Sequence, residues 1–84
     1  MTNIIQINDL TQLGAIMRAV RKSQRLRQDE VGPFSHTLIG DIEAGKPTAQ
    51  LGKVLGALRE LGIRLHVEFP AGIEIPPGLR EPTK

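Results

Sequence analysis

The sequence predicts a mostly α-helical, compact domain of four to five helices that ends in a single β-strand. Apolar residues recur at helical spacing in two long segments, and the apolar period changes from 3.6 to 2 after Gly62. The chain has 84 residues, which is enough for one domain but only for a small core. We therefore expect association with a second copy to add to its stability.

The two long helices are predicted from apolar stripes at i, i+3, i+4 and i+7. The first stripe can be capped by Asp9 or Thr11, and it consists of Leu13, Ile16, Met17 and Val20. The second ends at Gly62, a suitable left-handed residue after a helix, and it consists of Leu51, Val54, Leu55, Leu58 and Leu61. We expect these two helices to supply most of the core.

Two short elements are predicted between these helices. Proline cannot sit inside a helix, so Gly32-Pro33 must form a turn. After this turn, Ser35 can cap a short helix that Gly45 closes. The apolar residues available to these two elements are Leu26, Val31, Phe34, Leu38, Ile39 and Ile42.

A strand is predicted at residues 63–69, where Leu65, Val67 and Phe69 alternate with Arg64, His66 and Glu68. A lone strand must find a partner for its backbone groups. Residues 4–7 of the same chain and the same strand of a second copy are both candidates. We expect both pairings, with the twofold pairing as the main one.

The register of the twofold pairing is left open by the sequence. A dyad at His66 places Arg64 opposite Glu68, whereas a dyad displaced by one residue places His66 opposite Glu68. In either register we expect the dimer contacts to come from the same segment, that is, from Leu65, His66, Val67, Glu68 and Phe69.

These elements divide the chain into four parts. Residues 1–10 form an arm that can hold a short strand, and residues 11–62 form the helical domain. Residues 63–69 form the dimerisation strand, and residues 70–84 form a flexible tail rich in proline and glycine. The apolar tail residues either pack on their own dimer or serve a second partner; they are Ile73, Ile75 and Leu79.

The composition argues against an enzyme. The chain has two histidines and no cysteine, tyrosine or tryptophan, and we expect no catalytic residue, no metal and no cofactor. Ser35 and His36 are neighbours, about 100° apart on a helix, so they cannot form a nucleophile–base pair. No signal peptide or membrane span is recognisable, which predicts a cytoplasmic protein without a membrane partner.

Positive charge is concentrated in one part of the sequence although the formal net charge is only +2. No acidic residue lies between Leu10 and Gln28. Such a run either binds phosphates or forms a solvated helix face. The basic residues in it are Arg18, Arg21, Lys22, Arg25 and Arg27.

Three segments together resemble the phage-repressor-like (XRE-type) helix-turn-helix family. They are residues 26–32 (LRQDEVG), residues 34–39 with Phe34-Ser35 and Ile39, and residues 42–46 (IEAGK). The similarity covers roughly Leu13 to Leu61, which makes residues 11–62 a DNA-binding domain. The strand that follows Leu61 is similar to that of HipB-type antitoxins, which dimerise through it and accompany a HipA-like kinase toxin.

The resemblance implies roles for individual residues. Base edges would be read by His36, Thr37 and Asp41, of which Asp41 can only accept a hydrogen bond, from cytosine N4. Arg21 and Glu43 would form an ion pair between helices. Phosphates would be bound by Ser35, whose cap leaves helix amides facing the backbone, and by Gln28, Lys46, Arg18, Arg25 and Arg27.

By this resemblance the chain is a homodimeric repressor of its own operon, on a double-stranded inverted repeat with half-sites about 34 Å apart. It would be a bacterial, nucleoid-associated antitoxin whose partner is a HipA-like serine/threonine kinase toxin. One departure is that Gln28 and Ser35 are closer together than in the family by nearly one helical turn. Two alternatives are a phage-type or housekeeping regulator without a toxin and a protein-binding adaptor with a degenerate motif.

Overall fold

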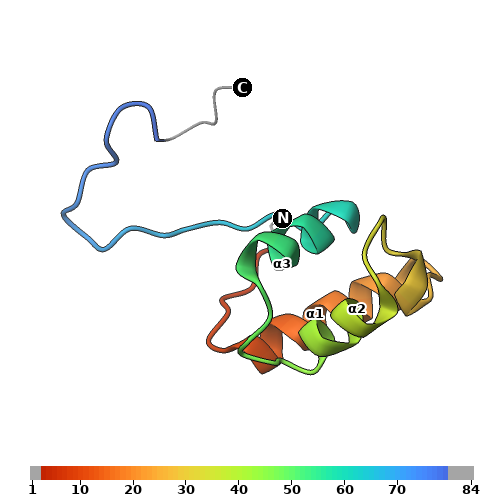
Figure 1. Cartoon of the computed structure of the whole chain (residues 1–84). Coiled ribbons are helices and arrows are strands. Elements are labelled where there is room, and N and C mark those ends of the chain that lie inside the picture. Colours follow the sequence, from red (N-terminus) through yellow and green to blue (C-terminus); the bar gives the residue numbers. More distant parts are fainter. Residues whose placement is uncertain (1–2, 80–84) are drawn as a thin grey trace.

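The computed structural model describes residues 3–79 and contains three α-helices and one 3-10 helix in that part of the chain. The α-helices are α1 (Leu10–Ser23), α2 (His36–Glu43) and α3 (Leu51–Glu60), and the 3-10 helix η1 (Gln28–Glu30) lies between α1 and α2 in sequence. Helices α1 and α2 pack side by side, and α3 lies along one side of this pair (Figure 1). None of these helices is long and apolar enough to cross a membrane.

Side-chain caps fix where α1 and α2 begin. The Gln12 backbone N–H donates to Asp9 Oδ1 at 2.7 Å, so Asp9 rather than Thr11 is the cap of α1. The Leu38 backbone N–H donates to the Ser35 hydroxyl at 3.1 Å, which confirms the predicted start of α2. Each cap satisfies a backbone donor that the helix itself leaves free.

All three α-helices end in the same way, with a left-handed residue whose own N–H and the N–H of the following residue donate to carbonyls of the last turn. These residues are Arg25 (φ 61°), Gly45 (φ 77°) and Gly62 (φ 80°). After α3, for example, the Gly62 and Ile63 N–H groups donate to the carbonyls of Arg59 and Leu58 at 3.0 and 2.9 Å. This is the Schellman arrangement, and the prediction of Gly62 as the terminator is confirmed.

The core lies between α1, α2 and α3, and each of these helices contributes to it. It consists of Met17, Val31, Ile39, Ile42, Val54, Ala57, Leu58 and Leu61. The predicted stripe on α3 is only partly correct, because Leu51 is 68% exposed and Leu55 is 37% exposed. The helix therefore presents an apolar edge that the other described residues do not cover.

Gly14 brings α1 and α2 into direct backbone contact. A Cβ at this position would lie 2.5 Å from the carbonyl oxygen of Glu43 and closer still to that of Ile42. Real Cβ atoms do not approach backbone oxygens so closely, so only glycine allows this helix spacing. The contact fixes the position of the last turn of α2 against α1.

Two parts of the predicted fold are wrong for the described residues. Four to five helices were expected, but the segment before Gly32 forms only the single turn η1, because Gly32 has φ 52° and Pro33 has no N–H to continue a helix. The expected pairing of residues 4–7 with residues 63–69 within one chain does not form, since residues 3–79 contain no strand.

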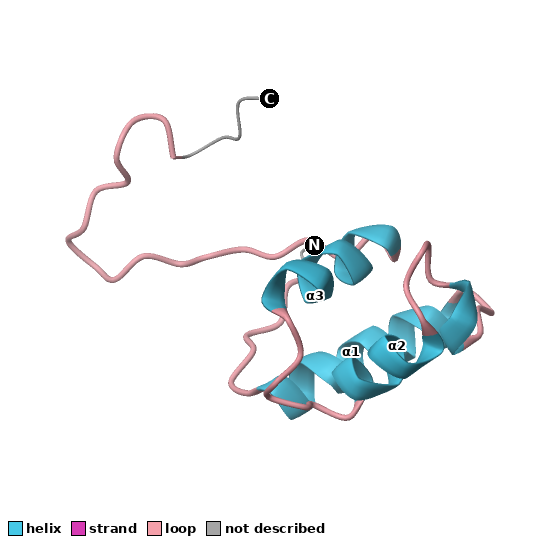
Figure 2. Ribbon diagram, in the orientation of Figure 1, coloured by secondary structure: helices cyan, strands magenta, loops and turns pink. Residues whose placement is uncertain are grey.

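The segment that follows α3 is extended and runs away from the helices (Figure 2). Leu65 and Val67 are 50% and 82% exposed, so residues 3–79 leave the apolar side of the predicted strand largely uncovered. Turns close at Ile73 and Leu79, whose N–H groups donate to the carbonyls of Pro70 and Pro76. Residues 80–84 of the predicted tail lie outside the described residues.

Candidate nucleic-acid interface

A buried ion pair joins the C-terminal turns of α1 and α2. Arg21 Nε donates to Glu43 Oε2 at 2.6 Å and Arg21 Nη2 donates to Glu43 Oε1 at 3.1 Å. A third donor of Arg21, Nη1, binds the carbonyl oxygen of Leu26 at 2.7 Å. The side chains are only 8% and 5% exposed, so the predicted pair between Arg21 and Glu43 is present as an internal, two-pronged contact.

Gln28 at the start of η1 adds a third hydrogen bond to Glu43. Its Nε2 donates to Glu43 Oε1 at 3.1 Å. Burial acts to raise the pKa of Glu43, but the hydrogen bonds from Arg21 and Gln28 and the charges of Arg21 and Arg18 outweigh it, so the pKa lies below its ordinary value. The carboxylate thus stays ionised and ties α1, η1 and α2 together.

The N-terminal turn of α2 is the most exposed part of this helix. Ser35 accepts the Leu38 N–H, while the side chains of His36 and Thr37 are exposed. The opposite side of the helix carries Ile39 and Ile42 into the core. Buried packing on one side and two polar side chains on the other are what a helix needs to enter a groove without leaving the domain.

Asp41 and Lys46 lie together at the far end of the exposed face of α2. Lys46 Nζ is 3.6 Å from Asp41 Oδ2, and both side chains are partly exposed. The Lys46 backbone N–H also donates to the Asp41 carbonyl as part of the helix terminus. The structure therefore brings a predicted base-reading residue and a predicted phosphate-binding residue into contact, and the ion pair is of the weak surface kind.

The three remaining arginines of the basic run differ in whether acidic side chains hold them. Arg18 is exposed on α1, and its charge reaches Glu43. Arg25 is exposed and has the left-handed backbone described above. Arg27 is held by acids, with Nε 3.0 Å from Asp29 Oδ1 and Nη2 3.9 Å from Glu30 Oε2. The hydrogen bond from Arg27 is the main reason that the pKa of the Asp29 carboxyl lies below its ordinary value.

The predicted dimer contacts lie on the extended segment after α3, apart from α2. Leu65, His66, Val67 and Glu68 are exposed, and Phe69 is partly buried.

Among residues 3–79 no group of three His, Cys, Asp or Glu side chains could hold a metal ion. Every buried side-chain nitrogen or oxygen in the same residues has a hydrogen-bond partner.

Sequence reasoning missed two residues of this arrangement. Gly14 was not singled out, although a glycine inside a predicted apolar stripe is a signal of close packing. Arg25 was noted only for its charge, and its left-handed backbone was not foreseen because arginine is not a usual residue there. Gln28 was assigned to a phosphate, yet its amide N–H is already used inside the domain.

Comparison with known proteins gives two similarities. The chain is 46% identical over 68 residues to an uncharacterized HTH-type transcriptional regulator, y4mF, of Sinorhizobium fredii (strain NBRC 101917 / NGR234), and the match covers 77% of this chain and 90% of that protein. A solved structure described as a HipB–O4 20mer complex superposes with a TM-score of 0.71 at 20% identity, over 79% of this chain and 97% of that one. No protein-family model matches the sequence.

Proposed function

The chain belongs to the helix-turn-helix (HTH-type) transcriptional regulators, and from this we propose that it is a DNA-binding repressor that acts as a homodimer on the promoter of its own operon. The family consists of regulators rather than enzymes. Its fold is that of HipB, whose solved structure is described as a complex with a 20mer. Duplex DNA is accordingly the first partner that we assign to this chain, and the bacterial cytoplasm, at the nucleoid, is where we place it.

The observation that carries this proposal is the way in which α2 is held. Glu43 at the end of the helix is locked by Arg21 and Gln28, and Gly14 sets its distance from α1. The opposite end of the helix is capped by Ser35 and presents His36 and Thr37 to solvent. A helix that is fixed at its C-terminal end and exposes polar side chains at its N-terminal end is suited to direct reading of base edges in the major groove.

Sequence reading is assigned to His36, Thr37 and Asp41, and positioning on the backbone to the groups around them. Ser35 leaves the first amides of α2 facing outward, toward where a phosphate would lie. Arg18 and Arg25 are exposed and can bind phosphates, and Lys46 would have to give up only its weak surface ion pair with Asp41. Arg27 and Gln28 would have to exchange a contact inside the domain for one with DNA, so we expect them to contribute less.

The homodimer is needed for the second half of the site. One α2 can read one half-site, and an inverted repeat with half-sites about 34 Å apart requires two copies related by a twofold axis. The exposed apolar side of residues 63–69 supports pairing of this segment across the dyad. Deleting Leu65 to Phe69 should therefore give a monomer by sedimentation, and it should weaken operator binding more than any single contact does, since two-site avidity is lost.

We further propose that the chain is the antitoxin of a HipA-like serine/threonine kinase. Two observations support this, the resemblance of the closing segment to HipB-type antitoxins and the HipB-like fold. The test is to co-express the chain with a kinase-like protein encoded beside it. Rescue of growth and co-purification are expected. A kinase that stays toxic and does not bind the chain would contradict the antitoxin proposal. It would favour the alternative of a regulator that has no toxin partner.

The repressor proposal itself is tested with a reporter driven by the chain's own upstream region. Expression of the chain should lower reporter output, and footprinting should show two protected half-sites on one face of the duplex. A chain with His36→Ala and Thr37→Ala serves as the matched control, because both positions are exposed and the fold should survive. Equal output with and without the intact chain would contradict the proposal and favour a protein-binding adaptor.

A further inference from the structure

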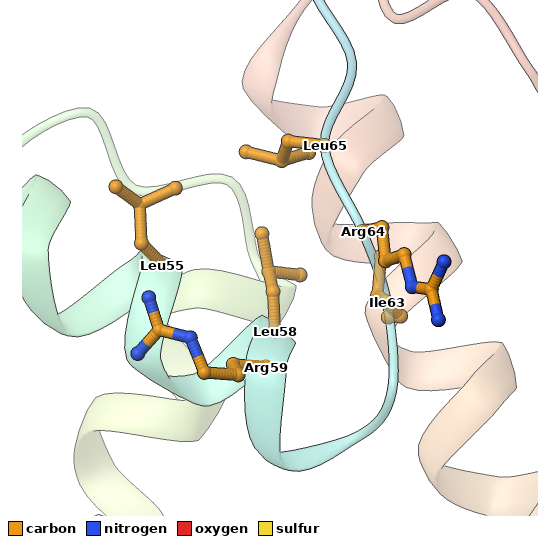
Figure 3. Close-up of a pocket in the computed structure, with 6 residues that line it drawn as sticks. All are labelled: Leu55, Leu58, Arg59, Ile63, Arg64 and Leu65. Carbon is orange, nitrogen blue, oxygen red and sulfur yellow. The ribbon is translucent and has the colours of Figure 1, made fainter. Parts of the chain in front are cut away.

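An apolar pocket opens between α3 and the extended segment that follows it. Its volume is about 220 Å³, and it is lined by Leu55, Leu58, Arg59, Ile63, Arg64 and Leu65. In Figure 3 the side chains of Leu55, Leu58 and Leu65 border one common space, while Arg64 extends from the other side of the segment. Leu55 and Leu65 are 37% and 50% exposed, so the chain leaves an apolar hollow open to solvent.

The size of the pocket suits one phenyl ring. Engineered apolar cavities of about 150 Å³ bind benzene, and this pocket is larger. The chain has two phenylalanines. Phe34 is used within the domain, where its ring packs so closely on Gly56 that a Cβ there would lie 2.8 Å from Cζ. Phe69 lies on the extended segment that follows α3 and is only partly buried, which makes it the aromatic residue available to fill a pocket elsewhere.

We propose that the pocket of one copy receives Phe69 of a second copy. This inference rests on the proposed homodimer and adds to it the residue that closes the interface. In antiparallel pairing about a dyad at His66, Phe69 of one chain lies opposite Ile63 of the other. Residues directly opposite each other share a face of the ribbon. Ile63 packs against the core and lines the pocket, so the opposing Phe69 faces the same pocket.

The alternation of the segment supports the same face. Ile63, Leu65, Val67 and Phe69 lie on one side of an extended chain, with Arg64, His66 and Glu68 on the other. In this register Val67 of the second copy lies opposite Leu65. The pairing thus covers the two most exposed apolar residues of the segment as well as the pocket, and it does so twice, once on each side of the dyad.

Charge complementarity points to a second copy as the occupant. The pocket rim carries two positive residues, Arg59 and Arg64. Residues 65–79 carry two glutamates, Glu68 and Glu74, and no lysine or arginine. With the dyad at His66, Glu68 lies opposite Arg64 on both sides of the interface. An acidic segment therefore pairs with a basic one on the face of the ribbon that points away from the pocket, while the apolar face covers the pocket.

The test uses the absence of cysteine from the chain. Two single variants of the full chain, Leu55→Cys and Phe69→Cys, are mixed, exchanged and oxidised, and the mixed disulfide is measured by mass spectrometry. It should exceed its statistical share. The matched control replaces Leu55→Cys by Leu51→Cys, one turn earlier on α3 and outside the pocket. A disulfide needs Cα atoms about 4.4 to 6.8 Å apart, so the control should give little mixed product.

Sedimentation of the unmodified chain and of Phe69→Ala separates this inference from the homodimer itself. Phe69→Ala should weaken the dimer about 30-fold, as loss of a central aromatic anchor does, whereas Leu79→Ala should change it less than about 3-fold. A dimer without the mixed disulfide, or an unchanged dimer in Phe69→Ala, would overturn the pocket assignment and leave the homodimer standing. A monomer would overturn both.

Discussion

Arg21 Nε lies 2.6 Å from Glu43 Oε2, across 22 residues of sequence, in the interior of the domain. The pair fixes the C-terminal end of α2 relative to α1. It therefore determines the direction in which the exposed N-terminal turn of α2 points. Removing one partner would leave the other charge buried without a counter-charge. We therefore expect Glu43→Gln or Arg21→Ala to lower the free energy of unfolding by about 3 to 5 kcal/mol in urea titrations.

The matched control is the exposed pair between Arg27 and Asp29. Arg27→Ala should change the free energy of unfolding by less than about 1 kcal/mol, since exposed ion pairs contribute little. Similar losses for Arg21→Ala and Arg27→Ala would contradict the structural role of the buried pair.

Stability should fall in acid because of Glu43. Its pKa lies below its ordinary value in the folded chain, whereas in the unfolded chain it returns to about 4.3. Between these values the unfolded state binds more protons, so the contribution of Glu43 is present above about pH 5 and is lost as pH falls through the folded pKa. Thermal melts from pH 6 to pH 3 should show the loss, and Glu43→Gln should flatten it.

Asp29→Asn is the control for the pH dependence. The pKa of Asp29 is also lowered, chiefly by the hydrogen bond from Arg27, but the carboxyl is exposed. This variant should keep most of the acid sensitivity of the unmodified chain. An Asp29→Asn variant as flat as Glu43→Gln would show that the buried carboxylate is not the main source.

Gly14→Ala should destabilise the chain although alanine is the better helix former. The added Cβ would meet the carbonyl oxygens of Ile42 and Glu43, and relief would require α1 and α2 to move apart. We expect a loss of about 1 to 3 kcal/mol in urea unfolding. Gly52→Ala on α3 has no atom within 4 Å of the new Cβ and should instead gain up to about 1 kcal/mol. A gain for both would refute the backbone contact.

Arg25→Gly should have opposite effects on folding stability and on DNA affinity. The left-handed backbone of Arg25 (φ 61°) disfavours any residue with a Cβ, so glycine should raise the free energy of unfolding by about 1 kcal/mol. If Arg25 binds a phosphate, the same variant should weaken binding to all sequences and reduce the salt dependence. Higher stability with unchanged DNA affinity would remove Arg25 from the interface.

The exposed residues of α2 should divide into two classes in DNA titrations. His36→Ala and Thr37→Ala should reduce the preference for the operator by about 1 to 3 kcal/mol and change binding to random DNA little. Lys46→Ala should weaken both and flatten the salt slope. Asp41→Asn should strengthen binding to random DNA, because it removes a negative charge and frees Lys46 from its partner. The same loss on both DNAs for all of these variants would contradict the assignment.

Local signals in the sequence were enough to predict several features of the fold. Ser35 and Gly62 were identified as helix boundaries because capping depends on neighbouring residues only. The pair between Arg21 and Glu43 followed from the resemblance to a family. The contact at Gly14 cannot be predicted from such local signals, because the contact depends on how two helices meet and not on either helix alone.

The remaining errors concern segments whose partner lies outside their own neighbourhood. Leu51 and Leu55 match a helical stripe, but within the described part of the chain their side chains stay exposed. The segment between the end of α1 and Gly32 is too short to form a helix longer than η1. The alternation in residues 63–69 predicts a strand, yet a strand needs a second strand, and residues 4–7 of the same chain do not supply it.

The most direct test of the central claim, that α2 reads operator DNA, is fluorescence anisotropy of labelled DNA titrated with the intact chain. The chain's own upstream region is compared with a scrambled duplex across a salt series. We predict a preference of at least about 10³-fold for the upstream sequence, with affinity falling steeply as salt rises. Binding that is absent, or equal for the two duplexes, would contradict the claim and would mean that the short segment between Gln28 and Ser35 no longer supports DNA reading.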